Sequence, residues 1–383
     1  MGQVSHKQLL LYIILGAFWL PLAVRFVPIV DKELKGVTGE LQQPAFTWKR
    51  WADGEYQKYT ESYYLDKLGF RKAATRLANE IDYRLGVQRK YCIVGKQHEL
   101  MGKEYIDSYY GRDYMGDDSI NKVVQRITAY QKLLNDSGVA FFVVLAPSKV
   151  RLYPDRIPDE LRDTIPAKTN YSELLRCMHA SGVPVLDFQP WFNATDSKSP
   201  YALFSNLGVH WSGYAATLCA DSLMGYIGRI TGKPTNRLKI TGVATVHEAS
   251  GTDRDMLDML NMYSEIPLTK PLGQIKGEIT VDTSKFIPSV LVVGDSYYWN
   301  IIYSGLPKYY FDKGSAYYYY NSKAYFNNDV TLPTKEVDVQ KVSFTKDVVI
   351  WLYAEPNLTK IGNGIDQQLL DAVSSKKARA NNE

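Results

Sequence analysis

The chain of 383 residues contains little cysteine. Its three cysteines, Cys92, Cys177 and Cys219, are far apart in the sequence and odd in number. At most one disulfide can form among them, and their spacing does not match a metal site. We therefore expect three small residues of the core and predict no metal site.

An excess of one charge sign is also absent. Lys and Arg total 45 against 41 Asp and Glu, which gives a formal net charge of +4, and no block of basic residues stands out. Nucleic-acid binding requires concentrated positive charge on one face or element. We therefore exclude nucleic acid as an expected partner.

Phenylalanine is scarce as well, at 13 residues, whereas tyrosine is abundant at 29. A tyrosine ring buries apolar area and keeps a polar tip, so tyrosine-rich surfaces often contact sugars and other amphipathic partners. Residues 317–320 are four consecutive tyrosines. They either contact a sugar or form an edge strand whose side chains alternate between two faces.

The longest uncharged apolar run is near the N-terminus. Residues 9–24 carry no charge, and Arg25 alone interrupts the run before residue 30. About 20 residues can therefore span a bilayer with Arg25 at the interface. We predict a membrane anchor with its flank over residues 1–35; a cleaved signal peptide and a buried soluble helix are the alternatives. Lys7 before the run favours an inner-membrane protein with most of the chain in the periplasm.

The rest of the chain alternates between helical and strand patterns. We predict a linker and helical lead-in over residues 36–90, one α/β domain over residues 91–373, and a polar tail over residues 374–383. Buried-strand patterns alternate with amphipathic helices in the central domain, which predicts a three-layer α/β/α fold with a mainly parallel sheet. The predicted strands cover residues 91–95, 139–146, 183–188, 290–293 and 348–353, and the helices cover 48–85, 120–134, 171–180 and 213–230.

The motif that carries the most chemistry is Gly294-Asp295-Ser296, directly after the apolar run 290–293. This order predicts a turn from strand to helix, which places Ser296 at the carboxyl end of a strand, where ligands bind in open α/β sheets. Backbone N–H groups at such a turn can hold an oxyanion that forms beside the serine oxygen. Asp and Ser are also ordinary helix-capping residues, so the tripeptide alone is a weak signal.

A second motif, Gly208-Val209-His210-Trp211-Ser212, precedes the helix predicted over residues 213–230. The N-terminus of a helix disfavours a positively charged imidazolium, so His210 is better suited to act as a neutral base. A hydrogen-bonded structural histidine is the alternative. We therefore predict that Ser296 and His210 act together.

Several stretches, in this order along the chain, resemble a known family. They are residues 66–71, residues 94–96, the segment 146–149 with Tyr-Pro and Ile-Pro after it, His210-Trp211-Ser212, and Val293-Gly294-Asp295-Ser296. From about residue 51 to residue 355 the sequence is similar to the SGNH-hydrolase-like domain of the periplasmic alginate O-acetyltransferases of the AlgJ/AlgX type. The resemblance implies an SGNH-like α/β/α domain, with Ser296 as the nucleophile and His210 as the general base.

The sequence departs from this family at one position. The resemblance implies an aspartate two residues before the histidine, but this position is Gly208. The acid of a catalytic triad orients the imidazole and stabilises its cation. Either another carboxylate replaces it, for which Asp295 and Glu355 are the candidates, or a Ser–His dyad works alone, or the domain has lost catalysis.

The implied reaction is acyl transfer through an acetylated Ser296 to a hydroxyl of a polysaccharide. We predict that Lys149, Tyr297 and Trp211 bind the substrate. No acetyl-CoA site is evident in the sequence, so we expect no cofactor; the resemblance implies that a membrane-bound O-acyltransferase supplies the acetyl group. A carbohydrate esterase and a catalytically inactive glycan-binding assembly protein are the competing functions.

Overall fold

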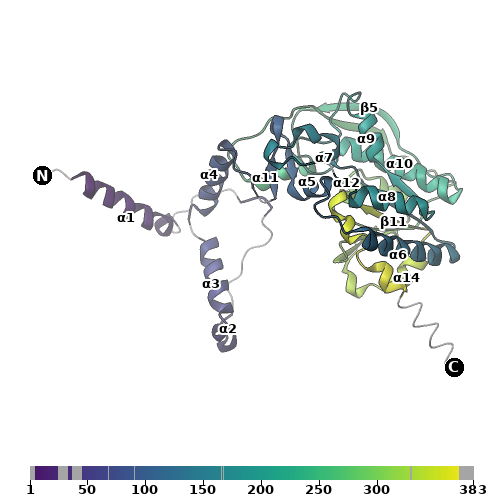
Figure 1. The fold of residues 1–383 in the computed structure, drawn as a ribbon, viewed down its shortest axis with the longest axis horizontal. Coiled ribbons are helices and arrows are strands. Elements are labelled where there is room, and N and C mark those ends of the chain that lie inside the picture. The colour runs from purple at the N-terminus through teal and green to yellow at the C-terminus, as the bar shows by residue number, and fades with distance from the viewer. Residues whose placement is uncertain are drawn as a thin grey trace. The chain divides into compact units, whose positions relative to one another are not determined.

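The structure is a computed structural model that describes residues 5–24, 33–36, 45–67, 69–89, 91–164, 166, 168–327 and 330–370. The chain divides into two compact units (Figure 1). Unit 1 comprises Met1–Gln88 and Leu257–Ile266, and unit 2 comprises Arg89–Met256 and Pro267–Glu383.

The main element of unit 2 is a sheet in which seven strands have the order β10-β9-β8-β7-β11-β3-β4. The strands from β8 to β4 pair in parallel, whereas β9 and β10 pair antiparallel at one end, so the sheet is mixed, and parallel pairing predominates among its described strands. Two-stranded sheets pair β1 with β2 and β5 with β6. The bounds are β1 (Cys92–Val94), β2 (Leu100–Gly102), β3 (Ala140–Leu145), β4 (Val185–Asp187), β5 (Lys239–Val246), β6 (Leu272–Glu278), β7 (Val290–Gly294), β8 (Ala316–Tyr319), β9 (Lys323–Phe326), β10 (Thr331–Pro333) and β11 (Val348–Tyr353).

The sheet lies between two hydrophobic clusters, one on each face. β3, β7 and β11 are rich in β-branched residues and buried on both faces, as the unbroken apolar runs predict. In Figure 1, β11 lies between α10 on one side and α6 on the other. The helices of unit 2 are α5 (Lys103–Tyr109), α6 (Asp117–Asp136), α7 (Lys149–Leu152), α8 (Asn170–Ala180), α9 (Gln189–Thr195), α10 (Gly213–Thr231), α12 (Tyr297–Tyr303), α13 (Leu306–Tyr310) and α14 (Val339–Phe344), and α11 (Asp255–Leu260) continues into unit 1.

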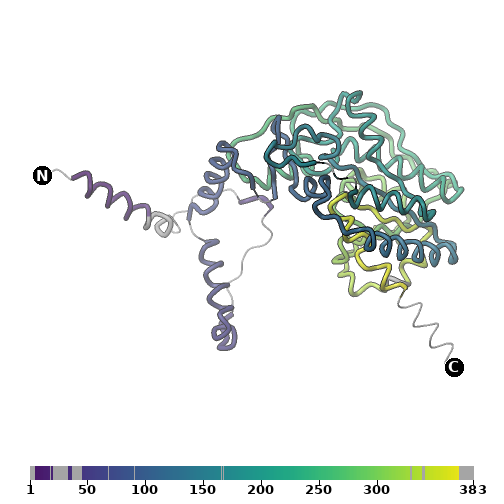
Figure 2. The backbone as a smooth tube through the Cα atoms, viewed as in Figure 1, coloured from purple at the N-terminus to yellow at the C-terminus, as the bar shows by residue number. Residues whose placement is uncertain are grey.

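The C-terminal part of the described chain completes one of these clusters. Ile361, Ile365 and Leu369 are buried in the cluster that also contains Ile127 of α6. Figure 2 shows the yellow C-terminal trace beside the dark blue trace of α6. The three-layer arrangement predicted from the sequence is therefore present, and the polar tail predicted after residue 373 lies outside the described residues.

Unit 1 contains the N-terminal helices α1 (His6–Val24), α2 (Trp48–Ala52), α3 (Glu55–Asp66) and α4 (Arg71–Arg84). Among the residues that the structure describes, no helix has both the length and the hydropathy needed to cross a membrane. The predicted anchor is therefore not found there, and residues 25–32, which the prediction also included, lie outside the described part.

Within unit 1, α4 binds the segment Leu257–Ile266. The Asn79 side chain donates to Leu260 O at 2.5 Å, and Glu80 accepts from the backbone N–H of Ser264 at 3.0 Å. Hydrogen bonds from Ser264 and Arg84 lower the pKa of Glu80 to about 2. The charged form of Glu80 is thus held firmly against this segment.

We expect Gly362→Ala to destabilise unit 2 more than Gly364→Ala. Both glycines have positive φ, at +82° and +79°. A Cβ at Gly362 would also lie 2.6 Å from the buried indole of Trp351, whereas nothing lies within 4 Å at Gly364. Urea unfolding should show a loss of about 3 kcal/mol for Gly362→Ala and about 1 kcal/mol for Gly364→Ala. Equal losses would show that the Trp351 contact contributes nothing.

Candidate active site

Ser296 lies directly after β7, at the carboxyl end of the parallel part of the sheet. β7 pairs with β11 up to Gly294 opposite Leu352, and a Cβ on Gly294 would lie 2.3 Å from Leu352 O. Glycine therefore permits the two strands to stay paired at this end. The chain then turns into α12, with Ser296 at φ −60° and ψ −17° as its first flanking residue.

His210 lies between Leu207 and the start of α10, in a loop fixed by a β-bridge from Phe204 to Trp211. The Ser212 hydroxyl caps α10 by accepting from Ala215 N at 3.2 Å. His210 is 9% exposed, and its Nε2 lies 2.9 Å from Ser296 Oγ. The structure thus brings together the two residues that the sequence motifs suggest.

The third residue of the cluster is Asp255, the first residue of α11. Its Oδ2 lies 2.6 Å from His210 Nδ1, and its Oδ1 accepts from the backbone N–H of Val209 at 2.9 Å. One carboxylate therefore holds both the imidazole and the loop that carries it. A serine oxygen, an imidazole and a carboxylate in this order form the geometry of a nucleophile activated by an oriented base.

Gly208 explains why this acid comes from a distant segment. A Cβ on Gly208 would lie 2.4 Å from Thr252 O and 3.1 Å from the carbonyl carbon of Asp253. The segment that leads to Asp255 therefore packs directly on the Gly208 backbone. An aspartate at position 208 has no room here, so the glycine and the distant acid belong to one arrangement.

Asp253 is a second carboxylate near His210. The pKa of Asp253 is raised to about 6, chiefly by burial and also by the charge of Asp255, whereas a hydrogen bond from the Gly213 N–H opposes the rise. Asp253 accepts that bond at 3.3 Å, at the start of α10. It therefore fixes the segment before Asp255 rather than the imidazole.

Asp295 and Glu355, the two predicted replacement acids, are bound elsewhere. The Asp295 carboxylate accepts from Ala354 N at 2.7 Å, from Asn357 at 2.8 Å and from Tyr297 N at 3.1 Å, and burial raises its pKa. It connects the turn after β7 to the turn after β11. Neither its oxygens nor those of Glu355 bond to His210, so the prediction of these acids as its partner is wrong in this structure.

Glu355 forms a buried ion pair with Arg151 of α7. The Arg151 Nε lies 2.8 Å from Glu355 Oε2, and a second bond joins its Nη2 to Oε1. Burial raises the pKa of Glu355, and the Arg151 charge opposes that shift. Glu355 therefore anchors α7 to the end of β11.

Lys149, predicted to bind substrate at the rim, is instead 1% exposed. Its Nζ lies 2.7 Å from Glu99 Oε1 and donates to Leu100 O at 2.8 Å and Gly208 O at 2.6 Å. Glu99, which is 0% exposed, also pairs with Arg156. Because Gly208 lies in the His210 loop, two residues before His210, Lys149 holds this loop from below the surface.

Tyr297 and Trp211, the other predicted substrate-binding residues, are both 0% exposed. The Tyr297 hydroxyl donates to Val209 O at 2.8 Å, and its ring centroid lies 4.8 Å from that of His210. Trp211 Nε1 donates to Tyr297 O at 3.2 Å. These side chains are buried supports of the histidine loop, and their burial excludes direct contact with a polymer in this conformation.

Tyr320 is a residue of the site that the sequence did not single out for this role. Burial and the charge of Asp295 raise the pKa of Tyr320 to about 12, and hydrogen bonds with the side chain and backbone of Ser296 oppose that shift. Asn357 donates to the Tyr320 hydroxyl at 3.3 Å. Tyr320 has φ +50° and directly follows β8. Its place at the end of the tyrosine run 317–320 is the sequence signal that could have indicated its position.

This fold and this cluster define a class of protein: α/β domains with a serine nucleophile after a central strand and a histidine base on a separate loop. Residues 105–304 match the family described as an SGNH hydrolase-like domain of acetyltransferase AlgX. The match covers more than half of the chain, so the chain belongs to this family. The resemblance noted in the sequence is confirmed.

The relatives are distant. The chain is 24% identical over 174 residues to the probable alginate O-acetylase AlgJ of Pseudomonas syringae pv. tomato, and the match covers 45% of this chain and 42% of that protein. The chain therefore spans less than half the length of this curated relative.

Two solved structures are also similar. The O-acetyltransferase domain of Pseudomonas putida AlgJ is 17% identical, with 71% of this chain and 93% of that chain covered and a TM-score of 0.48. Pseudomonas aeruginosa AlgX is 14% identical, with 74% and 71% covered and a TM-score of 0.44.

We predict that Lys149→Met lowers the kcat of ester turnover by about tenfold or more and leaves KM nearly unchanged, because a small displacement of the base is costly to the rate. Loss of the cation also leaves Glu99 buried with a single partner, so the variant should be less stable. The loss of rate is separated from the loss of stability by assays at 10 °C on protein whose near-UV circular dichroism is native. Lys96→Met, which removes an exposed pair with Asp159, is the control. Unchanged kcat in folded Lys149→Met would contradict a positioning role.

Proposed function

We propose that this protein is an O-acetyltransferase that moves acetyl groups onto hydroxyls of a polysaccharide through an acetylated Ser296. The observation that carries the proposal is the double hydrogen bonding of His210, at 2.9 Å to Ser296 and 2.6 Å to Asp255. Membership of an acetyltransferase family supports the choice of acyl group. The name of the relative, an alginate O-acetylase, supports a polysaccharide as the acceptor.

In the first half-reaction, Ser296 Oγ attacks the carbonyl carbon of the acetyl donor and transfers its proton to His210 Nε2. Asp255 accepts from His210 Nδ1–H and stabilises the imidazolium. The tetrahedral intermediate collapses as its bond to the leaving group breaks, and the leaving group takes the proton from His210. Acetyl-Ser296 is the product of this half.

In the second half-reaction, a sugar hydroxyl gives its proton to His210 and attacks the acetyl-Ser296 carbonyl. Collapse of this second intermediate forms the acetyl ester of the sugar, and His210 returns the proton to Ser296 Oγ. The same imidazole thus acts as base and acid in each half, which its fixed contact with Asp255 permits.

Tyr320 is suited to stabilise the oxyanion in both halves. Its hydroxyl lies beside Ser296, which influences its pKa, and accepts a hydrogen bond from Asn357 at 3.3 Å. A phenol with a pKa of about 12 keeps its proton at neutral pH and can donate it in a hydrogen bond where negative charge develops. We assign Tyr320 this role together with the backbone N–H of Ser296.

We also propose a place for the reaction. The apolar N-terminal sequence and the resemblance to periplasmic proteins favour an inner-membrane protein whose unit 2 acts in the periplasm. There a membrane-bound O-acyltransferase would supply acetyl groups. A reporter fused after residue 45 that is active only in the cytoplasm would overturn this location.

The competing function is an esterase, in which water replaces the sugar hydroxyl at the second half-reaction. The same residues serve both reactions, so an acceptor experiment separates them. Acetyl groups from an activated ester should appear on added polysaccharide; free acetate that does not change when polysaccharide is added would show hydrolysis instead.

We predict that Asp255→Asn lowers the turnover of an activated acetyl ester by about 10³- to 10⁴-fold, with little change in KM. The asparagine keeps the shape of the side chain but no longer stabilises the imidazolium or its Nδ1–H tautomer. Stopped-time assays of acetate release, with native circular dichroism, provide the measurement.

Asp258→Asn is the matched control for this experiment. Asp258 lies on the same helix, α11, but pairs with Lys35 at 2.7 Å. Its replacement should leave turnover within about twofold of the wild type, because exposed pairs contribute little. Wild-type turnover in folded Asp255→Asn would exclude Asp255 as the acid.

We further predict that Ser296→Ala and His210→Ala each abolish O-acetylation of polysaccharide in cells while the protein stays folded. Residues that act as a unit are non-additive, so the double variant should be no worse than either single variant. Acetylation that persists in both single variants would eliminate the enzymatic function.

A further inference from the structure

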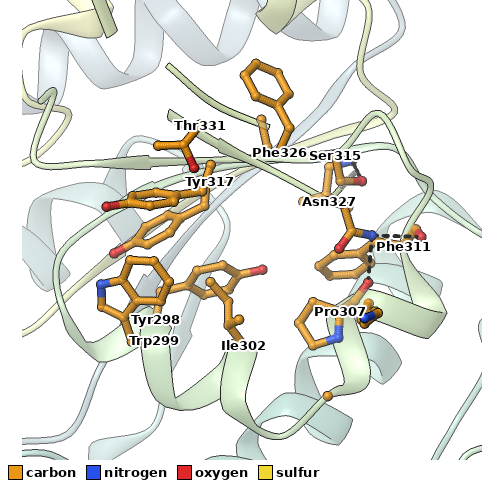
Figure 3. Close-up of a pocket in the computed structure, with 15 residues that line it drawn as sticks. Tyr298, Trp299, Ile302, Pro307, Phe311, Ser315, Tyr317, Phe326, Asn327 and Thr331 are labelled. Atoms are coloured by element: carbon orange, nitrogen blue, oxygen red, sulfur yellow. Dashed lines mark hydrogen bonds between the residues drawn. The ribbon is translucent and has the colours of Figure 1, made fainter. Parts of the chain in front are cut away.

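A second concave site lies in unit 2, apart from Ser296. α12, α13 and the strands β8 and β9 enclose a cavity of about 310 Å³ (Figure 3). Val290, the first residue of β7, lines this cavity, whereas Ser296 follows the opposite end of the same strand. The cavity is within the size range of small-ligand sites.

One wall of the cavity is aromatic. The ring centroids of Trp299 and Tyr325 lie 4.7 Å apart in an edge-to-face contact, and Tyr317 stacks with Tyr325 at 6.2 Å. Figure 3 shows the rings of Tyr317, Tyr298 and Trp299 gathered on one side of the cavity. The Tyr317 hydroxyl donates to Asp295 O, so the wall is fixed in place.

The facing wall carries a polar side chain, Asn327, beside Pro307 and Phe311 (Figure 3). Asn327 Nδ2 donates to Pro307 O at 3.2 Å, Asp312 O at 3.3 Å and Phe311 O at 3.4 Å, which fixes the orientation of the amide. Within the described part of the chain, its Oδ1 accepts no hydrogen bond and remains able to accept one from a ligand. Lys308 and Thr331 are exposed at the cavity, and no carboxylate is among the residues that line it.

The aromatic rings and the Asn327 amide together determine which class of ligand the cavity favours. A sugar ring has an apolar C–H face that packs on an aromatic ring and hydroxyls that donate to groups such as the Asn327 amide oxygen. An acyl chain would leave that amide oxygen without a donor, at the cost of a buried unsatisfied group. An anionic sugar would in addition be attracted by the charge of Lys308, and no carboxylate among the lining residues would repel it.

We propose that this cavity binds one sugar unit of a saccharide chain, with its C–H face on Tyr325 and Trp299 and a hydroxyl at Asn327. The site is separate from the acetyl-transfer site and needs no chemistry at Ser296. It places a saccharide beside α12, the helix that begins directly after the nucleophile, and it gives the abundance of tyrosine in this segment a binding role.

Isothermal titration of the full chain with a galacturonic acid hexamer and with cellohexaose tests the proposal. Tyr325→Ala should weaken binding of the saccharide by about tenfold or more. Tyr309→Ala is the matched control, since Tyr309 is a 49% exposed tyrosine of α13 that does not line the cavity. The affinity of Tyr309→Ala for the saccharide should equal that of the wild type.

A second variant guards against misfolding of the first. Thr331 is exposed at the cavity, so Thr331→Trp can obstruct the mouth without disturbing the core. It should also weaken binding, and Lys308→Gln should weaken binding of the galacturonic acid hexamer but not of cellohexaose. Turnover of a small activated ester should stay at the wild-type level in all these variants.

The outcomes separate this site from the proposed function. Saccharide binding that Ser296→Ala retains and Tyr325→Ala loses supports the cavity even if acetyl transfer is never detected. Failure of both hexamers to bind overturns the proposal. Binding of octanoate in their place, or saccharide affinity unchanged in Tyr325→Ala and Thr331→Trp, overturns it as well.

Discussion

The contact between His210 Nδ1 and Asp255 Oδ2 is the interaction on which the site depends. It is 2.6 Å long and joins a loop before α10 to the first residue of α11. The same carboxylate binds Val209 N, and Tyr297 and Lys149 hold the carbonyl groups of Val209 and Gly208. The loop is thus bound on several sides by buried groups. Such a preorganised arrangement avoids the cost of orienting the base during the reaction.

The same constraint explains which parts of the site the sequence could predict. Ser296 and His210 each stand beside a local signal, an apolar strand in one case and the start of a helix in the other. Asp255 has no such signal, because its role depends on the close approach of residues 252–253 to Gly208. The absence of the expected acid at position 208 was visible in the sequence, but the replacement required the tertiary structure.

Burial explains the errors at the other site residues. Lys149 follows a strand and carries a charge, which favours a place at the rim, but its pairing with Glu99 keeps both groups in the interior. Asp295 and Glu355 lie at strand ends as expected, yet backbone N–H groups and Arg151 occupy their oxygens. The alternation of helices and buried strands predicted the layers correctly, whereas the short strands β8 to β10 were too weakly patterned to show that the sheet is mixed.

The hydrogen bond from Asn79 to Leu260 O has a consequence for the order of folding. It joins positions 181 residues apart, and its acceptor lies five residues after Asp255. Contacts of such long sequence separation carry a high loop-closure entropy and tend to form late. During synthesis, α4 leaves the ribosome long before its partner segment exists. The Asn79 and Glu80 side chains of α4 therefore stay hydrated until the segment after Asp255 has been synthesised.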